Sequence, residues 1–155
     1  AERAATLASQ VVDRLEGVGV FCLELFQLPN GELLINEIAP RPHNSGHYTL
    51  DACSVSQFEQ QVRAVSGMPL GEVRLLSPAV MVNLIGDDAT IVMNGAGCRT
   101  LLGIPGAVLH LYGKRDIRSR RKMGHVTFLG ETLGLALDRA KRFREGLASS
   151  LSRPA

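Results

Sequence analysis

The chain has 155 residues, of which 45% are hydrophobic and 21% are charged, a composition typical of a soluble globular protein with an apolar core. A formal net charge of +2 is too small to indicate a nucleic-acid or membrane partner from the whole chain. No apolar run approaches the roughly 20 residues that cross a bilayer, and nothing at the N-terminus resembles a secretion signal, so we expect a cytoplasmic protein. Because Ala1 already lies in a helical pattern, we expect the sequence to be a piece of a longer polypeptide.

The first half of the sequence predicts two helices around a β-hairpin. Asn30 and Gly31 form a strong hairpin signal between two runs of strand-forming residues. Ser56 and Glu59 have the spacing of a helix-capping box. We expect helices at 2–16 and 56–66 and strands at 18–27 and 32–39.

The second half of the sequence consists of short strand-like runs punctuated by Gly and Pro, with a helical pattern at the end. The composition changes between Leu70 and Ser77, so we predict two domains, at residues 1–72 and 73–155. The predicted fold class is α+β, and the second domain is small and β-rich with a terminal helix. We expect strands at 79–85, 90–93, 107–112 and 123–129 and the helix at 131–151.

Each arm of the predicted hairpin carries a glutamate where an apolar residue is expected. With the Asn-Gly pair at the centre of the turn, Glu24 lies directly opposite Glu37. Like charges in this arrangement destabilise a sheet, so a shared proton or a divalent cation must offset their repulsion. Magnesium is usually held by one or two carboxylates together with substrate phosphates. The alternative is that the register is slipped or a bulge intervenes, and that each glutamate pairs with an arginine such as Arg41 or Arg63.

The loop after the second strand packs several kinds of hydrogen-bond donor into the seven residues from Arg41 to His47. The planar fork of Arg41 suits carboxylate, bicarbonate or phosphate oxygens, and His43 and Asn44 can orient an anion or a proton. A cation site beside an anion site is what phosphoryl transfer requires.

A basic segment runs from Lys114 to Lys122, where six of nine residues are Lys or Arg. Aromatic stacking residues are nearly absent nearby, so we expect no nucleic-acid site. Two interpretations stay open: a solvated connecting loop, and a phosphate clamp in which Lys114 converges with an arginine. His110 and His125 lack metal-ligand spacing in the sequence, and we expect core or surface histidines rather than ligands.

Three runs of sequence carry a resemblance to a known family: EIAPRPHNSGHYT from Glu37, IPGAVLHLYGK from Ile104, and RRKMGH from Arg120. They closely resemble the carboxy-terminal part of 5-(carboxyamino)imidazole ribonucleotide synthetases, which are ATP-grasp ligases of purine biosynthesis. The resemblance covers nearly the whole chain but only about the last two-fifths of such an enzyme.

The resemblance implies an ATP- and Mg²⁺-dependent ligase that joins bicarbonate to aminoimidazole ribonucleotide through carboxyphosphate, and a homodimer of the full-length enzyme. It implies the carboxy-terminal lobe of an ATP-grasp domain at residues 1–72. Since the other lobe is not among these residues, we expect the chain alone to turn over ATP poorly or not at all.

The resemblance also implies roles for the hairpin residues. Glu24 and Glu37 resemble the magnesium ligands between ATP phosphates, and Asn36 with Glu37 resembles a nucleotide-contacting pair. Ala39 departs from the wider ATP-grasp pattern, in which many relatives have an asparagine as a third metal ligand.

The substrate roles fall on the two donor-rich loops. Arg41, His43 and Asn44 resemble the residues that hold bicarbonate or the imidazole substrate near the transferred phosphoryl group. Lys114 and Arg121 resemble the residues that bind the phosphate of the ribonucleotide. The family usually has Pro-Gly before that arginine, whereas this chain has Ser-Arg.

Two other functions remain open from the sequence. A formate-dependent glycinamide ribonucleotide transformylase has a similar loop, although its usual version departs from the run Asn44 to His47. The chain is alternatively a binding or assembly module that folds and holds metal or nucleotide weakly without catalysis.

Overall fold

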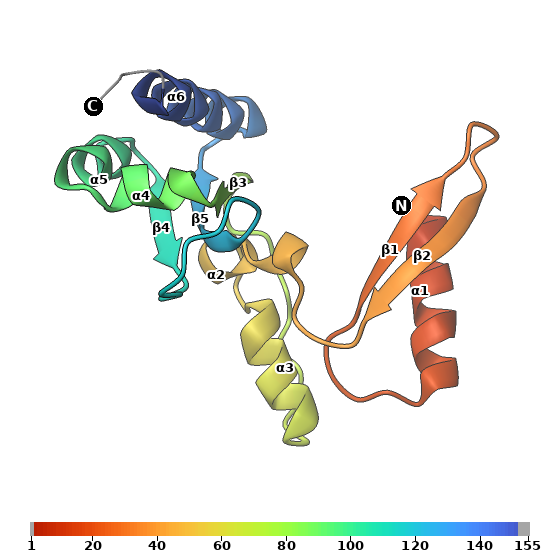
Figure 1. Cartoon of the computed structure of the whole chain (residues 1–155). Helices are drawn as coiled ribbons and strands as arrows, with labels where there is room; N and C mark the ends of the chain where they lie inside the picture. Colours follow the sequence, from red (N-terminus) through yellow and green to blue (C-terminus); the bar gives the residue numbers. More distant parts are fainter. Residues whose placement is uncertain (1, 152–155) are drawn as a thin grey trace. The chain divides into compact units, whose positions relative to one another are not determined.

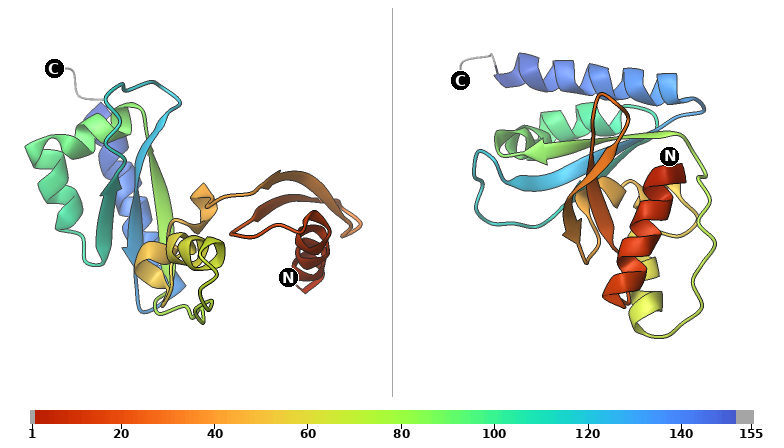
Figure 2. Two further views of the ribbon diagram at one scale, coloured as in Figure 1. Left: turned by 90° about the horizontal axis from the view of Figure 1, so that it is seen from below. Right: turned by 90° about the vertical axis from the view of Figure 1, so that its right-hand side faces the viewer.

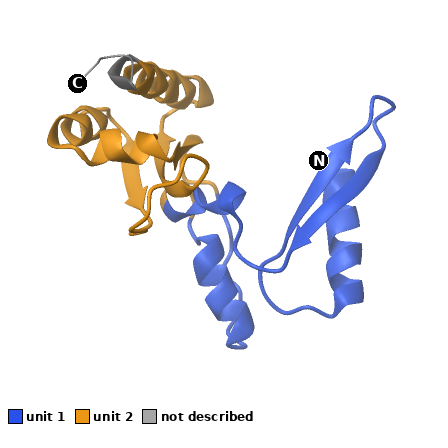
Figure 3. Cartoon of the chain, viewed as in Figure 1, with its two compact units in different colours: residues 1–50, 54–74 blue, residues 51–53, 75–155 orange. Residues whose placement is uncertain are grey.

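A computed structural model describes the backbone of residues 2–151 and the side chains of residues 2–148. The chain forms two compact units, which Figure 3 shows in different colours. Unit 1 contains Ala1–Leu50 and Ser54–Arg74, and unit 2 contains Asp51–Cys53 and Leu75–Ala155. No helix among the described residues is both long and apolar enough to cross a bilayer.

Unit 1 begins with a helix that lies along a two-stranded antiparallel sheet (Figure 1). Leu23 and Leu25 line one shallow pocket together with residues of the helix. Because side chains alternate along a strand, Glu24 lies on the opposite face of the sheet. The three elements are α1 (Glu2–Leu15), β1 (Cys22–Gln27) and β2 (Leu33–Ala39).

Three short helical segments follow the hairpin. They are the 3₁₀ helix η1 (Asn44–Gly46) and the α-helices α2 (Thr49–Ala52) and α3 (Gln57–Val65). The side chain of Ser56 accepts a hydrogen bond from the backbone N–H of Glu59 at 3.1 Å. This confirms the predicted helix start at Ser56, whereas the Glu59 carboxylate pairs with Arg63 and does not complete the capping box. The segments η1 and α2 were not predicted.

The turn of the hairpin has three residues rather than the predicted two. The backbone N–H of Leu28 donates to the carbonyl of Glu32 at 2.9 Å. Leu28 therefore faces Glu32, whereas a two-residue turn would place Pro29 opposite Glu32. Gly31 adopts a φ of 81°, a left-handed conformation that favours glycine. The predicted turn length is therefore wrong, and the strand register near the turn is shifted by one residue from the predicted one.

A β-bulge then returns the hairpin to the predicted register. Leu25 pairs with Ile35 and Glu24 pairs with Glu37, so Asn36 is the extra residue on β2. The predicted opposition of the two glutamates is confirmed, because the longer turn and the bulge offset each other.

Unit 2 is a three-stranded antiparallel sheet in the order β3-β5-β4, with three helices (Figures 1 and 2). The strands confirm those predicted at 79–85, 107–112 and 123–129, and the last helix confirms the prediction at 131–151. The elements are β3 (Ala79–Ile85), α4 (Asp87–Met93), α5 (Gly95–Leu102), β4 (Ala107–Leu111), β5 (Lys122–Leu129) and α6 (Leu133–Leu151).

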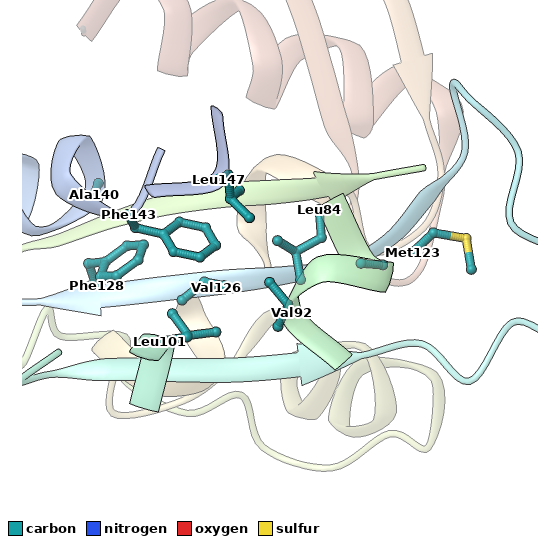
Figure 4. Close-up of a cluster of buried hydrophobic side chains, with 10 residues drawn as sticks. Leu84, Val92, Leu101, Met123, Val126, Phe128, Ala140, Phe143 and Leu147 are labelled. Carbon is teal, nitrogen blue, oxygen red and sulfur yellow. The ribbon is translucent and has the colours of Figure 1, made fainter. Parts of the chain in front are cut away.

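The core of unit 2 lies between one face of this sheet and the three helices (Figure 4). Phe128 is fully buried, and its ring lies 5.4 Å from that of Phe143 between centroids. The opposite face of the sheet carries buried polar residues, His125 and Thr127. The core cluster comprises Leu84, Ala89, Val92, Leu101, Met123, Val126, Phe128, Ala140, Phe143 and Leu147.

The strand predicted at 90–93 is wrong, because these residues belong to α4. Its β-branched residues favour a strand locally, but Ala89 and Val92 are buried three residues apart, which is the spacing of one helical face. The glycines after it open a second helix, α5, which was not predicted. A side chain on Gly97 would overlap the carbonyl of Ile91, so this glycine allows the two helices to pack closely.

Candidate active site

The two opposed glutamates of the hairpin have different surroundings. Oε1 of Glu24 lies 3.3 Å from Nε2 of His43, and its Oε2 accepts a hydrogen bond from the amide of Asn36 at 3.4 Å. The Glu37 side chain is exposed and has no ion-pair partner among the described residues. The negative charge of Glu24 is therefore partly offset by its contacts with His43 and Asn36. The exposed carboxylate of Glu37 is available to bind a cation.

Neither arginine that the sequence suggested as a partner contacts these glutamates. Arg63 pairs with Glu59, four residues away on the same helix. Nη1 of Arg41 donates to the carbonyl of Pro42 at 3.1 Å. The arginine-paired alternative is wrong, and Arg41 retains further guanidinium donors for an anion.

The loop after β2 aims the ring of His43 at Glu24. Nδ1 of His43 accepts a hydrogen bond from the backbone N–H of Ser45 at 3.4 Å and lies 2.9 Å from the Ser45 hydroxyl. With Nδ1 as acceptor, the neutral ring carries its proton on Nε2, which then donates to Glu24. The loop thus favours one ring orientation and one tautomer.

A second side chain, Gln57, holds the backbone of this loop. Its Oε1 accepts from the N–H of His43 at 2.9 Å, and its Nε2 donates to the carbonyl of the same residue at 2.8 Å. Nε2 also lies 2.7 Å from Nδ1 of His47. A side chain on Gly46 would overlap the Gln57 amide, so glycine is needed for this close approach. Gln57 therefore positions both histidines of the loop.

Replacing Gln57 with leucine is expected to free the loop. The variant loses the two hydrogen bonds to the His43 backbone and the contact with His47, which together contribute about 1 to 3 kcal/mol to stability. Hydrogen exchange on the whole chain measures the effect directly, because the His43 amide loses its acceptor. We expect at least a tenfold faster exchange at His43.

The matched control is Gln60→Leu on the same helix, where the amide makes two comparable bonds with the backbone of Gly71, at 2.6 and 3.0 Å. This variant should lose similar stability while the His43 amide stays protected. Unchanged exchange at His43 in the Gln57 variant would contradict the positioning role.

Asn44 brings an unsatisfied acceptor to the loop. Its Oδ1 is buried and has no hydrogen-bond partner within the described part of the chain. Leaving such an acceptor unpaired costs free energy, and a donor such as a water molecule or an amine would satisfy it. Asn44 directly follows His43 in the chain.

The predicted phosphate-binding residues lie in unit 2, on the loop that joins β4 to β5. Nζ of Lys114 donates to the carbonyl of Lys122 at 2.7 Å, and Nη1 of Arg121 donates to the carbonyl of Asp116 at 3.1 Å. Both cations thus bind carbonyls of their own loop and keep further donors. The carbonyl of Arg121 accepts from the N–H of Gly86 at 3.0 Å, which ties the loop to the end of β3.

The structure groups the predicted residues in two sets, one in each unit. In unit 1, Glu24 contacts Asn36 and His43 and lies opposite Glu37, while Arg41 and Asn44 are neighbours of His43 in the loop. Sequence reasoning missed Gln57. Its only local signal is its place after the helix cap, which does not reveal a contact 14 residues away.

Paired carboxylates beside a donor-rich loop are an arrangement found in proteins that transfer phosphoryl groups with a divalent cation. Residues 1–58 match the ATP-grasp domain, and residues 79–139 match the phosphoribosylaminoimidazole carboxylase C-terminal domain. The chain thus carries part of an ATP-grasp domain followed by that carboxy-terminal domain, and it corresponds to the carboxy-terminal part of carboxyaminoimidazole ribonucleotide synthases. The resemblance and the fold class predicted from the sequence are confirmed.

Among its relatives, the chain is 51% identical over 128 residues to the N5-carboxyaminoimidazole ribonucleotide synthase of Bacillus subtilis, which covers 83% of this chain and 32% of that protein. The chain therefore spans about a third of that relative's length.

Solved structures of these synthases also match nearly the whole of this chain and about two-fifths of their own length. The synthetase of Thermotoga maritima superposes with a TM-score of 0.82 at 48% identity, over 93% of this chain and 40% of that one. The synthase of Aspergillus clavatus in complex with ADP and 5-aminoimidazole ribonucleotide superposes with a TM-score of 0.83 at 33% identity, over 95% and 40% of the two chains.

Proposed function

We propose that the chain supplies part of the active site of an ATP-dependent ligase that carboxylates aminoimidazole ribonucleotide with bicarbonate. The observation that carries the proposal is the Glu24–Glu37 pair, with His43 bound to Glu24 at the start of the donor-rich loop. The similarity to the Bacillus subtilis synthase and to the Aspergillus clavatus synthase in complex with ADP and 5-aminoimidazole ribonucleotide supports it.

Magnesium is the cofactor that suits the carboxylate pair. Glu37 has no competing ion pair among the described residues, and the Glu24 carboxylate has lone pairs beyond the two contacts it makes. Glu24 and Glu37 would hold the ion, which when bound neutralises charge on the ATP phosphates. Asn36, the bulged residue directly before Glu37 on β2, would contact the nucleotide together with Glu37.

The loop residues would handle the acceptor side of the reaction. Arg41 offers a forked donor to bicarbonate or to the carboxyphosphate formed from it. His43, held by Gln57 and Ser45, would orient the substrate through a ring of fixed tautomer. The buried Oδ1 of Asn44 would accept a hydrogen bond from the amine that attacks the carboxyl group.

Lys114 and Arg121 would bind the phosphate of the ribonucleotide. The test uses a chimera in which this chain replaces the matching segment of the Bacillus subtilis synthase. Lys114→Ala is expected to raise the KM for the ribonucleotide about tenfold while kcat changes little, since the lost charge-assisted bond contributes about 1.5 kcal/mol.

Arg115→Ala is the matched control, because it removes one positive charge from an exposed residue of the same loop. It should leave the KM near that of the parent. Equal KM values for the parent and the Lys114 variant would indicate that the segment is a solvated connecting loop and not a phosphate clamp.

The alternative enzyme function is formate-dependent transformylation of glycinamide ribonucleotide. Isotope-labelled bicarbonate and labelled formate, each supplied to the chimera with its own ribonucleotide, distinguish the two reactions. Label from bicarbonate should enter the product, and label from formate should not. Retained magnesium binding with no labelled product from either would favour the non-catalytic binding module.

We also propose that the domain boundary lies near residue 72, and that the whole protein is a cytoplasmic homodimer with small-molecule substrates and no nucleic-acid or membrane partner. Sedimentation of the chimera tests the dimer.

A further inference from the structure

Three metal-binding side chains meet on the polar face of the sheet in unit 2. His110 on β4 and His125 on β5 are direct cross-strand partners, and their rings stack with centroids 4.6 Å apart at an angle of 15°. Both carboxylate oxygens of Asp51 lie 3.0 Å from Nε2 of His110. One ligand atom from each of the three residues lies within 4.8 Å of the others.

Neighbouring groups favour a bound ion at this place. The hydroxyl of Tyr112 lies 2.8 Å from Nδ1 of His125. A phenol hydroxyl at this distance can donate to that nitrogen. Metal-binding histidines usually have such a partner on the nitrogen away from the ion, which leaves Nε2 as the ligand atom.

Asn83 adds an oxygen beside the same ring. It pairs with His125 in the register of β3 and β5, so the two side chains share a face of the sheet. Its Oδ1 is buried and has no hydrogen-bond partner among the residues that the structure describes. A water molecule bound to a metal ion is a donor that would satisfy this acceptor.

We propose that Asp51, His110 and His125 form a binding site for a divalent transition metal such as Zn²⁺. Two imidazoles and one carboxylate are a ligand set typical of these ions, with a further position for water. In a tetrahedral zinc site, ligand atoms about 2.1 Å from the ion lie about 3.4 Å from one another. The 3.0 Å between His110 and Asp51 is close to that value.

Binding needs only local changes. The ion takes the place of the proton between Nε2 of His110 and Asp51, and the ligand atoms, all within 4.8 Å of one another, approach by at most about 1.5 Å through side-chain rotation to reach zinc geometry. All three residues belong to unit 2, and none belongs to the proposed carboxylate site of unit 1. The two sites can therefore be tested independently.

Cobalt is the probe, because Co²⁺ in a tetrahedral site with nitrogen and oxygen ligands absorbs visible light. The whole chain, freed of metal with a chelator, is titrated with Co²⁺ at pH 7.5 and then with Zn²⁺ as competitor. We expect one equivalent of Co²⁺ to give a visible band that Zn²⁺ abolishes.

Single substitutions show whether the cobalt ion binds at Asp51, His110 and His125 or at another place in the chain. Asp51→Asn and His110→Ala should each weaken cobalt binding at least 100-fold, and Tyr112→Phe about 10- to 100-fold as an outer partner. His43→Ala, which removes a histidine of unit 1, should leave the band unchanged. Circular dichroism melting establishes that each variant is folded.

Two results would overturn the proposal. One is the absence of a band with the parent chain, which would leave the cluster as a metal-free hydrogen-bonded network. The other is an unchanged band in folded Asp51→Asn and His110→Ala, which would place the cobalt elsewhere.

Discussion

Glu37→Gln is expected to lower kcat/KM of the chimera by about 100-fold at limiting magnesium, the largest effect on activity that the site predicts. Glutamine keeps the size of the side chain but removes the negative charge that faces Glu24 across the hairpin. The remaining carboxylate, Glu24, already contacts His43 through one oxygen and Asn36 through the other, so it has fewer lone pairs left for the cation. The steady-state rate as a function of magnesium concentration measures the loss.

Glu32→Gln provides the control, because it removes the same charge from an exposed glutamate at the turn of the same hairpin. Its magnesium dependence should match that of the parent. High magnesium should restore part of the activity of the Glu37 variant, while the parent and the Glu32 control stay equal at every magnesium concentration. A Glu37 variant with the parent's activity at limiting magnesium contradicts the metal assignment.

Phe128→Ala is expected to destabilise the chain by about 3 to 5 kcal/mol, the largest effect on folding. Phe128 is fully buried on β5, the central strand of unit 2, and it packs against Phe143 of α6. Truncation opens a cavity between sheet and helix that neighbouring side chains fill only in part. Urea unfolding followed by circular dichroism gives the change in free energy.

Phe26→Ala is the matched comparison, because this ring on β1 is 57% exposed. It should cost less than about 1 kcal/mol, as substitutions at exposed positions usually do. Similar losses for the two variants would mean that the core of unit 2 is not where the stability of the chain resides.

The opposed glutamates show how a prediction from sequence can be right for an incomplete reason. The alternation of the strands and the Asn-Gly pair placed Glu24 opposite Glu37, and the structure agrees. Yet the turn has three residues, and only the bulge at Asn36 restores the pairing. Neither the turn length nor the bulge has a local signal strong enough to be read from the sequence, because both depend on how the hairpin twists.

Helices α4 and α5 show the opposite case, in which local signals misled. The run at 90–93 is rich in β-branched residues, and the glycines after it are typical of loops. Tertiary packing outweighs these preferences, since burial of Ala89, Val92 and Leu101 against the sheet requires helical spacing. The capping residue Asn94, whose side chain accepts from Gly97 at 2.7 Å, was the available signal.

Contacts between distant parts of the chain could not be predicted. Gln57 reaches His43 across 14 residues, and Asp51 reaches His110 across 59. The sequence spacing of His110 and His125 excluded them as ligands of a local motif, but strand pairing makes them direct neighbours. Sequence reasoning therefore identified the donor-rich loop and the carboxylates, and missed the residues that position them.

The central claim is that this chain supplies the cation and substrate residues of an ATP-dependent carboxylation. Its most direct test is ADP formation by the chimera with ATP, magnesium and bicarbonate, with and without aminoimidazole ribonucleotide. We predict ADP release that requires the ribonucleotide and equals the carboxylated product in amount. A folded chimera that releases no ribonucleotide-dependent ADP, beside an active Bacillus subtilis synthase, would contradict the claim.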